Sequence, residues 1–337
     1  MANPVIAELI RGELLESSHA GALAIAHPTG ELVVAFGDVR RPIYPRSAIK
    51  ALQCLPLIET GAADRFSFGN QELALACASH SGADEHVAVA GAMLARAGLD
   101  LAALGCGAHE PLGVEAAQQL MRLGRAPTAL NNNCSGKHAG MLATAVHHGE
   151  TTAGYTDPRH PVQQRIAAVL EAFTSRSIAA TEPGIDGCSA PNWAIPLADL
   201  ATAFARLGSG DGLQPARRGA VERIRNACWA EPLLVAGNGR LDTVLLGRFP
   251  GRLFLKTGAE GVYCGAIPGR ALGFALKIDD GAKRASEIAV QALIARLLPE
   301  ASSLPSAVGQ TNWTGLDVAE LRCSQEYVAA LERCRPV

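Results

Sequence analysis

The spacing of apolar residues changes twice along this chain. Residues 5–15, 21–26 and 31–36 are short segments rich in apolar residues, and the turn sequence His27-Pro28-Thr29-Gly30 joins the last two. Short apolar runs separated by Pro and Gly are typical of a β-meander. The chain is therefore predicted to begin with strands.

From Ser47 to about Ala230 the apolar residues recur at helical spacing, with capping residues or glycines beside the segments. The clearest predicted helices there are 83–97, 114–123, 136–148, 162–173, 197–207 and 215–229. After Pro232 the pattern returns to strands.

The strands predicted in the last third of the chain are 252–256, 261–267 and 271–278, which we expect to pair antiparallel. Residues 282–298 then predict a long amphipathic helix. In the tail we expect a loop followed by two short helices, at 316–321 and 324–331.

Strands at both ends of a chain form one sheet when they pair with each other. We therefore predict an α/β fold in which residues 1–45 and 231–337 build an antiparallel sheet with flanking helices. Residues 46–230 would form a mainly helical subdomain inserted between these segments, within one compact catalytic unit.

The composition excludes several classes of protein. Of 337 residues, 48 % are hydrophobic and 18 % charged, which is globular rather than disordered. The net charge of −2 and the absence of basic clusters argue against binding to nucleic acid or a membrane surface. Charged residues or His interrupt each apolar stretch before it could span a bilayer.

The nine cysteines are scattered, and the N-terminus has no basic region followed by an apolar run. We therefore expect a cytoplasmic protein without disulfides, whose cysteines are buried, metal-binding or nucleophilic.

Ser47 and Lys50 form the first candidate for catalysis. They lie three residues apart at the start of a predicted helix and would share one face of it. A helix N-terminus disfavours a lysine charge, so its field would push Lys50 toward the neutral amine, which can act as a base toward a hydroxyl. The alternative is that Ser47 only caps the helix.

Lys256-Thr257-Gly258 follows a predicted strand late in the chain, where its glycine lets the backbone approach a ligand. Together with Ser47-Ala48-Ile49-Lys50 it matches two of the three signatures of penicillin-recognising serine enzymes. The alternative for this tripeptide alone is an ordinary strand end. Ser79 has no capping role and is a candidate to pair with Lys256.

The sequence Asn131-Asn132-Asn133-Cys134-Ser135-Gly136-Lys137-His138 is polar between two apolar segments. Cys188 lies in another loop rich in glycine and proline. These residues are too few for a structural zinc site but fit a metal with an open position. The alternative is that both cysteines are buried and inert, and the residues alone leave the choice open.

Four motifs together resemble the Rhizobium etli-type L-asparaginases over nearly the whole chain. They are Pro45-Arg46-Ser47-Ala48-Ile49-Lys50-Ala51, Ser79-His80-Ser81-Gly82, 131–138 as quoted above, and Asp186-Gly187-Cys188-Ser189-Ala190-Pro191. The resemblance implies a fold similar to that of serine β-lactamases and glutaminases, and a homodimer that releases ammonia from L-asparagine.

The resemblance also implies roles for single residues. Ser47 with Lys50, and Ser79 with Lys256, would be two Ser–Lys couples, while Cys134, Lys137 and Cys188 would hold Zn²⁺ with a water. The residues expected around the substrate are Arg46, His80, Asp186, Thr257 and Gly258, with Asp186 facing the α-ammonium group.

We therefore predict hydrolysis of L-asparagine to L-aspartate and ammonia through an acyl-enzyme on Ser47. One alternative is a glutaminase or another amidohydrolase of the same fold. Glutamine differs from asparagine by one methylene, and a pocket discriminates between two such substrates by only about 1–3 kcal/mol. The other alternative is a non-catalytic protein that binds a metal or an amino acid.

Overall fold

The computed structural model describes residues 2–178 and 181–334, and these residues form two compact units. Unit 1 comprises 1–48, 195–209 and 256–337, within the described residues, and unit 2 comprises 49–194 and 210–255. The segment 195–209 thus belongs to unit 1, although it lies inside the range 46–230. The division into subdomains proposed from the sequence stays a prediction.

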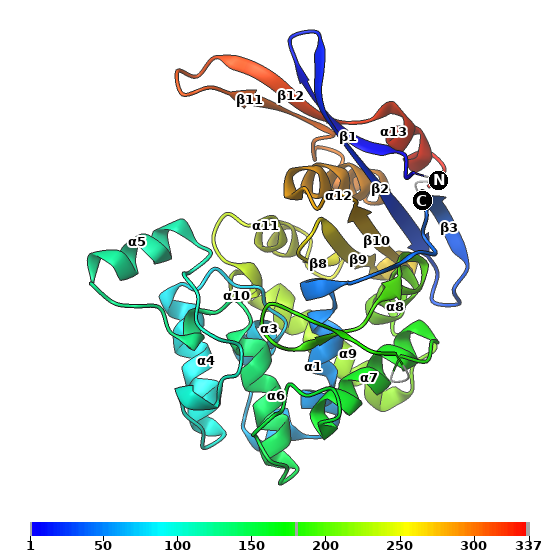
Figure 1. Ribbon diagram of the computed structural model, residues 1–337. Coiled ribbons are helices and arrows are strands. Elements are labelled where there is room, and N and C mark those ends of the chain that lie inside the picture. Colours follow the sequence, from blue (N-terminus) through cyan, green and yellow to red (C-terminus); the bar gives the residue numbers. More distant parts are fainter. Residues whose placement is uncertain (1, 179–180, 335–337) are drawn as a thin grey trace. The chain divides into compact units, whose positions relative to one another are not determined.

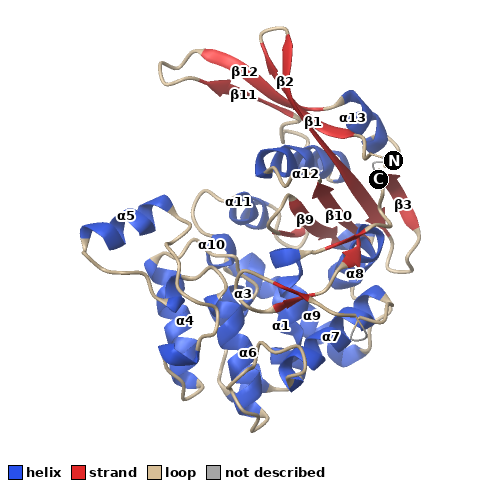
Figure 2. Cartoon of the chain, in the orientation of Figure 1, coloured by secondary structure: helices blue, strands red, loops and turns tan. Residues whose placement is uncertain are grey.

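Unit 1 contains an eight-stranded sheet in the order β11-β12-β1-β2-β10-β9-β8, with β3 also paired to β2 (Figures 1 and 2). The strands are β1 Val5–Arg11, β2 Leu14–Ala26, β3 Leu32–Phe36, β8 Phe254–Thr257, β9 Val262–Ile267, β10 Leu272–Ile278, β11 Ala307–Thr311 and β12 Asp317–Cys323. Neighbouring strands from the two chain ends pair antiparallel, as β1 with β12 and β2 with β10. This confirms an α/β fold whose antiparallel sheet is built from both ends of the chain.

Helices α8 (Leu197–Ser209), α12 (Lys283–Leu297) and α13 (Gln325–Leu331) pack beside this sheet in unit 1. A side chain at Gly273 would lie 2.1 Å from the carbonyl oxygen of Ala201, so only glycine lets β10 and α8 approach this closely. A short ladder of β4 (Pro42–Ile43) with β7 (Ile195–Pro196) leads into α8.

The tail departs from the prediction at one element. Residues 317–323 form β12, so the helix expected at 316–321 is wrong, whereas the helix expected at 324–331 is confirmed as α13. Leu321 and Cys323 alternate with exposed residues, which is the period of a strand, and pairing with both β1 and β11 decides the conformation.

Unit 2 is mainly helical, and the predicted helices between 83 and 229 that belong to it are all present. Its helices are α1 Lys50–Glu59, α2 Ala62–Arg65, α3 Asn70–Ala76, α4 Asp84–Arg96, α5 Val114–Arg122, α6 Ser135–His147, α7 Pro161–Thr174, α9 Pro215–Ala230, α10 Pro232–Ala236 and α11 Leu241–Arg248. A two-stranded ladder, β5 (Gly184–Ile185) with β6 (Pro191–Asn192), holds the loop of Cys188.

Helix α1 lies at the centre of unit 2 and contacts α3, α6, α7 and α9, and all its residues from Lys50 to Ile58 are buried. Helix α6 begins directly against the end of α3. A side chain at Gly136 would lie 2.4 Å from the carbonyl oxygen of Leu75, so glycine is needed for this contact. The close approach brings the loop after α3 beside the first turn of α6.

Across the residues that the structure describes, no helix is both long and apolar enough to cross a membrane.

Candidate active site

Lys50 is the first residue of α1, and its side chain is fully buried in unit 2. Its Nζ donates to the carbonyl oxygen of Ala78, to Oγ of Ser79 at 3.0 Å and to the carbonyl oxygen of Asn133 at 3.4 Å. The two carbonyl oxygens can only accept hydrogen bonds. A neutral Lys50 would therefore give them its two N–H groups and direct its lone pair at the Ser79 hydroxyl.

The loop that carries Ser79 is held by its backbone. The amide of Ser79 donates to the carbonyl oxygen of Val235 at 2.9 Å, and that of His80 donates to Asn133 at 3.3 Å. Ser79 is 5 % exposed, so the loop brings its hydroxyl to Lys50 in a site from which most water is excluded.

His80 is fully buried, and both of its ring nitrogens have protein partners. The amide of Gly82 donates to Nδ1 at 3.1 Å, so Nε2 carries the proton and donates to Oγ of Ser135 at 2.9 Å. The ring also stacks on His86, with centroids 4.8 Å apart. Burial, followed by the charges of His86 and Lys50, lowers the pKa of His80 well below its ordinary value. Its assignment to the substrate stays a prediction.

The three asparagines anchor the loop before α6. The Asn132 side chain donates to the carbonyl oxygen of Cys106 at 2.8 Å and accepts from the amide of Cys134 at 2.9 Å. Asn131 caps the preceding turn together with Thr128. The polar run therefore serves to fix the positions of Asn133 and Cys134.

A second cluster surrounds the sulfur of Cys188. Nζ of Lys137 donates to Cys188 Sγ at 3.1 Å, and Cys134 lies near enough to that sulfur to affect its pKa. Each of these side chains is at most 4 % exposed. The three residues expected to hold a metal therefore lie together in unit 2.

The protonation of this cluster follows from its hydrogen bonds and charges. The hydrogen bond from Cys134, with help from Lys137, lowers the pKa of Cys188 against the opposing effect of burial. The same hydrogen bond and burial raise the pKa of Cys134. Burial alone lowers the pKa of Lys137, but the thiolate charges outweigh it and the net pKa is raised. These shifts favour the charged forms of Lys137 and Cys188.

His138 is a residue that the sequence reasoning missed. Its Nδ1 lies 2.5 Å from the hydroxyl of Tyr155, while its buried Nε2 has no hydrogen-bond partner by distance and angle. The imidazole lies near enough to Cys188 for each group to shift the pKa of the other. A signal was present, because positions 134 and 138 are one helical turn apart. No sequence signal points to Tyr155.

The cluster offers sulfur and nitrogen donors. Thiolate sulfur and nitrogen are the ligands zinc prefers, and an unpartnered Nε2 beside two cysteines is an orphaned polar atom of the kind that a metal satisfies. Within residues 2–178 and 181–334, however, no group of three or more His, Cys, Asp or Glu is placed to hold a metal ion. Any zinc site formed by Cys134 and Cys188 would therefore depend on Lys137.

Asp186 lies in the turn before Cys188 and is half-buried. Its backbone accepts from Ser189 at 2.8 Å and donates to Ala190 at 2.9 Å, and Ser189 adopts a φ of 69° that closes the turn. The carboxylate also contributes to the raised pKa of Lys137. Its role toward an α-ammonium group stays a prediction.

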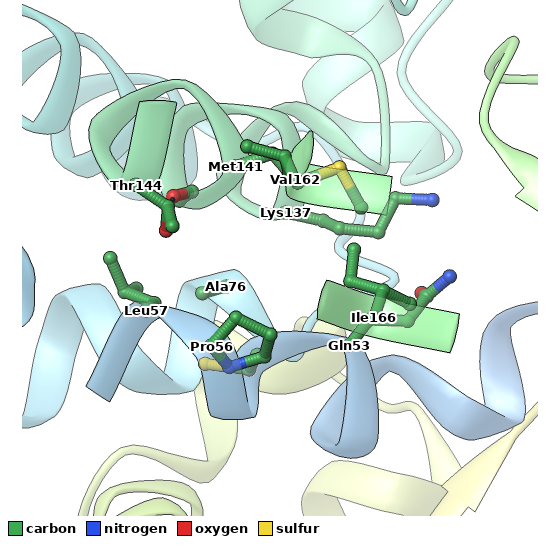
Figure 3. Close-up of a pocket in the computed structure, with 11 residues that line it drawn as sticks. Gln53, Pro56, Leu57, Ala76, Lys137, Met141, Thr144, Val162 and Ile166 are labelled. Carbon is green, nitrogen blue, oxygen red and sulfur yellow. Dashed lines mark hydrogen bonds between the residues drawn. The ribbon is translucent and has the colours of Figure 1, made fainter. Parts of the chain in front are cut away.

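Lys137 also borders a small cavity between α1, α6 and α7 (Figure 3). The cavity has a volume of about 10 Å³, and Gln53, Met141 and Ile166 are among its other walls. This space suits at most one water molecule, so it is a small packing gap beside the Lys137 side chain rather than a substrate site.

In unit 1, Ser47 lies in a 3₁₀ turn, Arg46–Ile49, that leads into α1. Arg46 has a φ of 52°, which is strained for a residue with a side chain. Gly258 packs against this turn, because a side chain there would lie 2.7 Å from the carbonyl oxygen of Pro45 and 3.3 Å from the amide of Ala48. Unit 1 therefore brings the Ser47 turn together with the end of β8.

Lys256 is 1 % exposed, and its Nζ donates to the carbonyl oxygen of Thr257 at 3.0 Å. Thr257 donates from Oγ1 to the carbonyl oxygen of Gly258 at 3.3 Å. The pairings of Ser47 with Lys50 and of Ser79 with Lys256 each join a residue of unit 1 to one of unit 2, and they stay predictions.

The family model described as L-asparaginase II matches residues 7–322. The chain belongs to the L-asparaginase II family. This confirms, at the level of the family, the predicted resemblance to L-asparaginases. A search of curated proteins found no match.

Several solved structures are similar to this member of the family at low identity. The native form of Mglu is 15 % identical with a TM-score of 0.44, over 81 % of this chain and 64 % of that one. A β-lactamase from Mycobacterium bovis is 12 % identical with a TM-score of 0.39, over 82 % and 94 %. D-alanine carboxypeptidase AmpC from Burkholderia cenocepacia is 14 % identical with a TM-score of 0.38, over 80 % and 90 %.

Proposed function

We propose that the protein is an L-asparaginase of the Rhizobium etli type, which converts L-asparagine to L-aspartate and ammonia. The observation that carries the proposal is the match to the L-asparaginase II family over residues 7–322. The buried hydrogen bond between Lys50 and Ser79 supports it, because it is a lysine–hydroxyl pair suited to proton transfer.

In the proposed reaction, Ser47 attacks the carbon of the side-chain amide and Lys50 takes its proton. Backbone N–H groups of the turn at Ser47 stabilise the oxyanion, and Lys50 passes the proton to the amide nitrogen, so that the C–N bond breaks and ammonia leaves. Water then hydrolyses the β-aspartyl ester while Ser79 and Lys256 relay protons. Because Lys50 already contacts Ser79, Ser79 is the second candidate for the nucleophile.

Arg46, Asp186, Thr257 and Gly258 would bind the substrate, with Asp186 receiving the α-ammonium group. Cys134, Lys137 and Cys188 would hold zinc, and the metal would supply a positive charge that orients and polarises a bound oxygen. We also propose that the enzyme is a cytoplasmic homodimer.

The test is release of ammonia from L-asparagine and L-glutamine, and hydrolysis of a β-lactam, each with and without a chelator. We expect ammonia from L-asparagine above all. A preference for L-glutamine or the β-lactam would favour another amidohydrolase. Binding of zinc and asparagine without ammonia release would instead identify a non-catalytic binding protein.

The nucleophile is tested separately with Ser47→Ala and Ser79→Ala. We expect Ser47→Ala to lower turnover on the order of 10³-fold or more. Near-normal turnover in Ser47→Ala together with loss in Ser79→Ala would move the attack to Ser79.

A further inference from the structure

Strand β11 forms an unprotected edge of the unit 1 sheet. It pairs with β12, and within the described part of the chain no strand covers its other side. Residues 307–309 and 311 are exposed, and residues 301–316 include no charged side chain. Proteins usually protect such edges with charges, prolines or short strands, because free N–H and C=O groups recruit another strand.

The turn after β11 exposes Trp313 completely, at 106 % of its reference area. The turn is nonetheless well ordered by hydrogen bonds. Asn312 Oδ1 accepts from the amides of Thr314 and Leu316, each at 3.0 Å, and the Asn312 amide donates to Leu316 at 2.9 Å. A tryptophan held fully in water on a defined turn is typical of an interface anchor.

The same unit has a groove with both apolar and polar walls next to the start of β11. It lies between α12 and α13, has a volume of about 570 Å³, and its apolar walls include Ala292, Leu304, Val328 and Leu331. Its polar walls are Arg296, Glu332, Ser302 and Ser306. An indole ring can fill an apolar groove and stack on a guanidinium group.

We propose that β11 pairs antiparallel with β11 of a second copy of this chain, about a two-fold axis at Gly309, and that Trp313 of each copy enters the groove of the other. This rests on the proposed homodimer and assigns its interface. In this register Trp313, four residues after the axis, lies opposite Pro305 of the second copy, four residues before it. Residue 305 follows Leu304, a wall of the groove.

A second copy fits this surface better than an unrelated peptide for two reasons. The edge strand and the groove it would need are on the same unit, so a two-fold axis satisfies both at once. Because residues 301–316 carry no charge, no like charges meet across the axis.

The area is also sufficient for a stable dimer. A buried tryptophan covers up to about 250 Å², so two rings and the groove walls they cover account for about 1,000 Å² before β11 is counted. Specific interfaces bury about 1,200–2,000 Å² in total.

The first test is mass in solution by sedimentation equilibrium. The wild-type chain should sediment at about 70 kDa, twice its 35.0 kDa, in a dimer as expected for an interface of this size. Trp313→Glu and Val308→Lys should each raise the dimer dissociation constant at least 100-fold while circular dichroism and ammonia release by the variants show that they are folded. The control is Met121→Glu, an apolar residue of unit 2 that is 78 % exposed.

The second test is the register. Gly309→Cys should form a disulfide-linked dimer under a mild oxidant, because symmetric mates in an antiparallel pair lie about 4.5–5.5 Å apart, within disulfide range. Gln310→Cys should not, since its partner in this register is residue 308. Native cysteines add little background because all nine are buried.

The outcomes separate this proposal from the proposed dimer and the proposed activity. A wild-type chain that stays monomeric at micromolar concentration overturns both the dimer and its interface. A dimer that survives Trp313→Glu and Val308→Lys, without crosslinking at residue 309, overturns the interface alone. Ammonia release is measured independently of either result.

Discussion

Lys50 donates a hydrogen bond from its buried Nζ to Oγ of Ser79 over 3.0 Å. The contact joins the first residue of α1 to the loop after α3 and lies wholly within unit 2. With two carbonyl oxygens as the other acceptors, it gives the lysine a defined orientation in either protonation state. Lys50 is therefore placed to act as a base without first having to move.

We expect Lys50→Gln to lower turnover of L-asparagine at least 10³-fold, because glutamine keeps donors for the carbonyl oxygens but cannot accept a proton from a serine. Ser79→Ala should lower turnover by a smaller factor, of about 10²-fold, as expected for loss of one proton-transfer group. Mass spectrometry of Ser79→Ala mixed with L-asparagine should then show accumulated β-aspartyl enzyme.

Ser81→Ala is the matched control for Ser79→Ala, because it removes a buried hydroxyl from the same loop. It should leave turnover within a few-fold of wild type. Full turnover in Lys50→Gln would contradict the role of Lys50 as a base.

Zinc binding should depend on both cysteines and on Lys137. We expect the wild-type chain to hold about one zinc per chain, as for a catalytic site with three protein ligands. Cys188→Ser and Lys137→Met should each weaken zinc affinity by at least 10-fold in competition with a chromogenic chelator. Cys54→Ala, which removes a buried thiol from α1, is the control and should bind zinc normally. Unchanged affinity in Cys188→Ser would place any metal elsewhere.

His138→Gln extends this test to the residue that the sequence reasoning missed. Its Nε2 has no hydrogen-bond partner among the described residues, and the ring and Cys188 shift each other's pKa, so its removal should also weaken zinc affinity, by a smaller factor than Cys188→Ser. Equal affinity in His138→Gln and wild type would show that the imidazole does not act on the metal.

The elements with strong local signals were predictable from the sequence. Helices such as α4 and α9 carry helical periodicity with flanking stops, and β9 and β10 carry apolar runs with a turn between them. Strand β12 was not predictable, because its conformation depends on pairing with β1, more than three hundred residues away in the chain.

The candidate site divides in the same way. Cys134, Lys137 and Cys188 were predicted as one cluster through a family resemblance, and they do lie together. The contact of Lys50 with Ser79 was not predicted, because it depends on how closely α3 and α6 approach each other and α1. That approach depends on Gly136, whose role only the packing shows.

We expect Gly136→Ala to destabilise the protein by about 1–3 kcal/mol, since its methyl group would lie 2.4 Å from the Leu75 carbonyl oxygen and force α6 away from α3. Urea unfolding measures the loss. Gly140→Ala in the same helix is the control, because its methyl group would meet the flexible end of Leu57 at 3.2 Å and make an ordinary contact with the Ala76 methyl at 3.5 Å. There alanine should be neutral or stabilising by up to about 1 kcal/mol. Equal stability of the two variants would contradict this account of the contact.

Stability should fall in mild acid because of buried histidines. Burial lowers the pKa of His86 below 6.5, and its Nε2 donates to the carbonyl oxygen of Leu233 at 3.1 Å. Below pH 6.5 the unfolded chain binds a proton that the folded chain does not, so stability decreases as the pH falls, by up to about 1.4 kcal/mol per pH unit for each such group.

Urea unfolding at pH 7.5 and 5.5 should show a smaller loss for His86→Gln than for wild type. Some loss should remain, because the pKa of His80 is lowered as well. His27→Gln, at a partly exposed position, should behave as wild type. An equal loss in wild type and His86→Gln would show that acid acts through other groups.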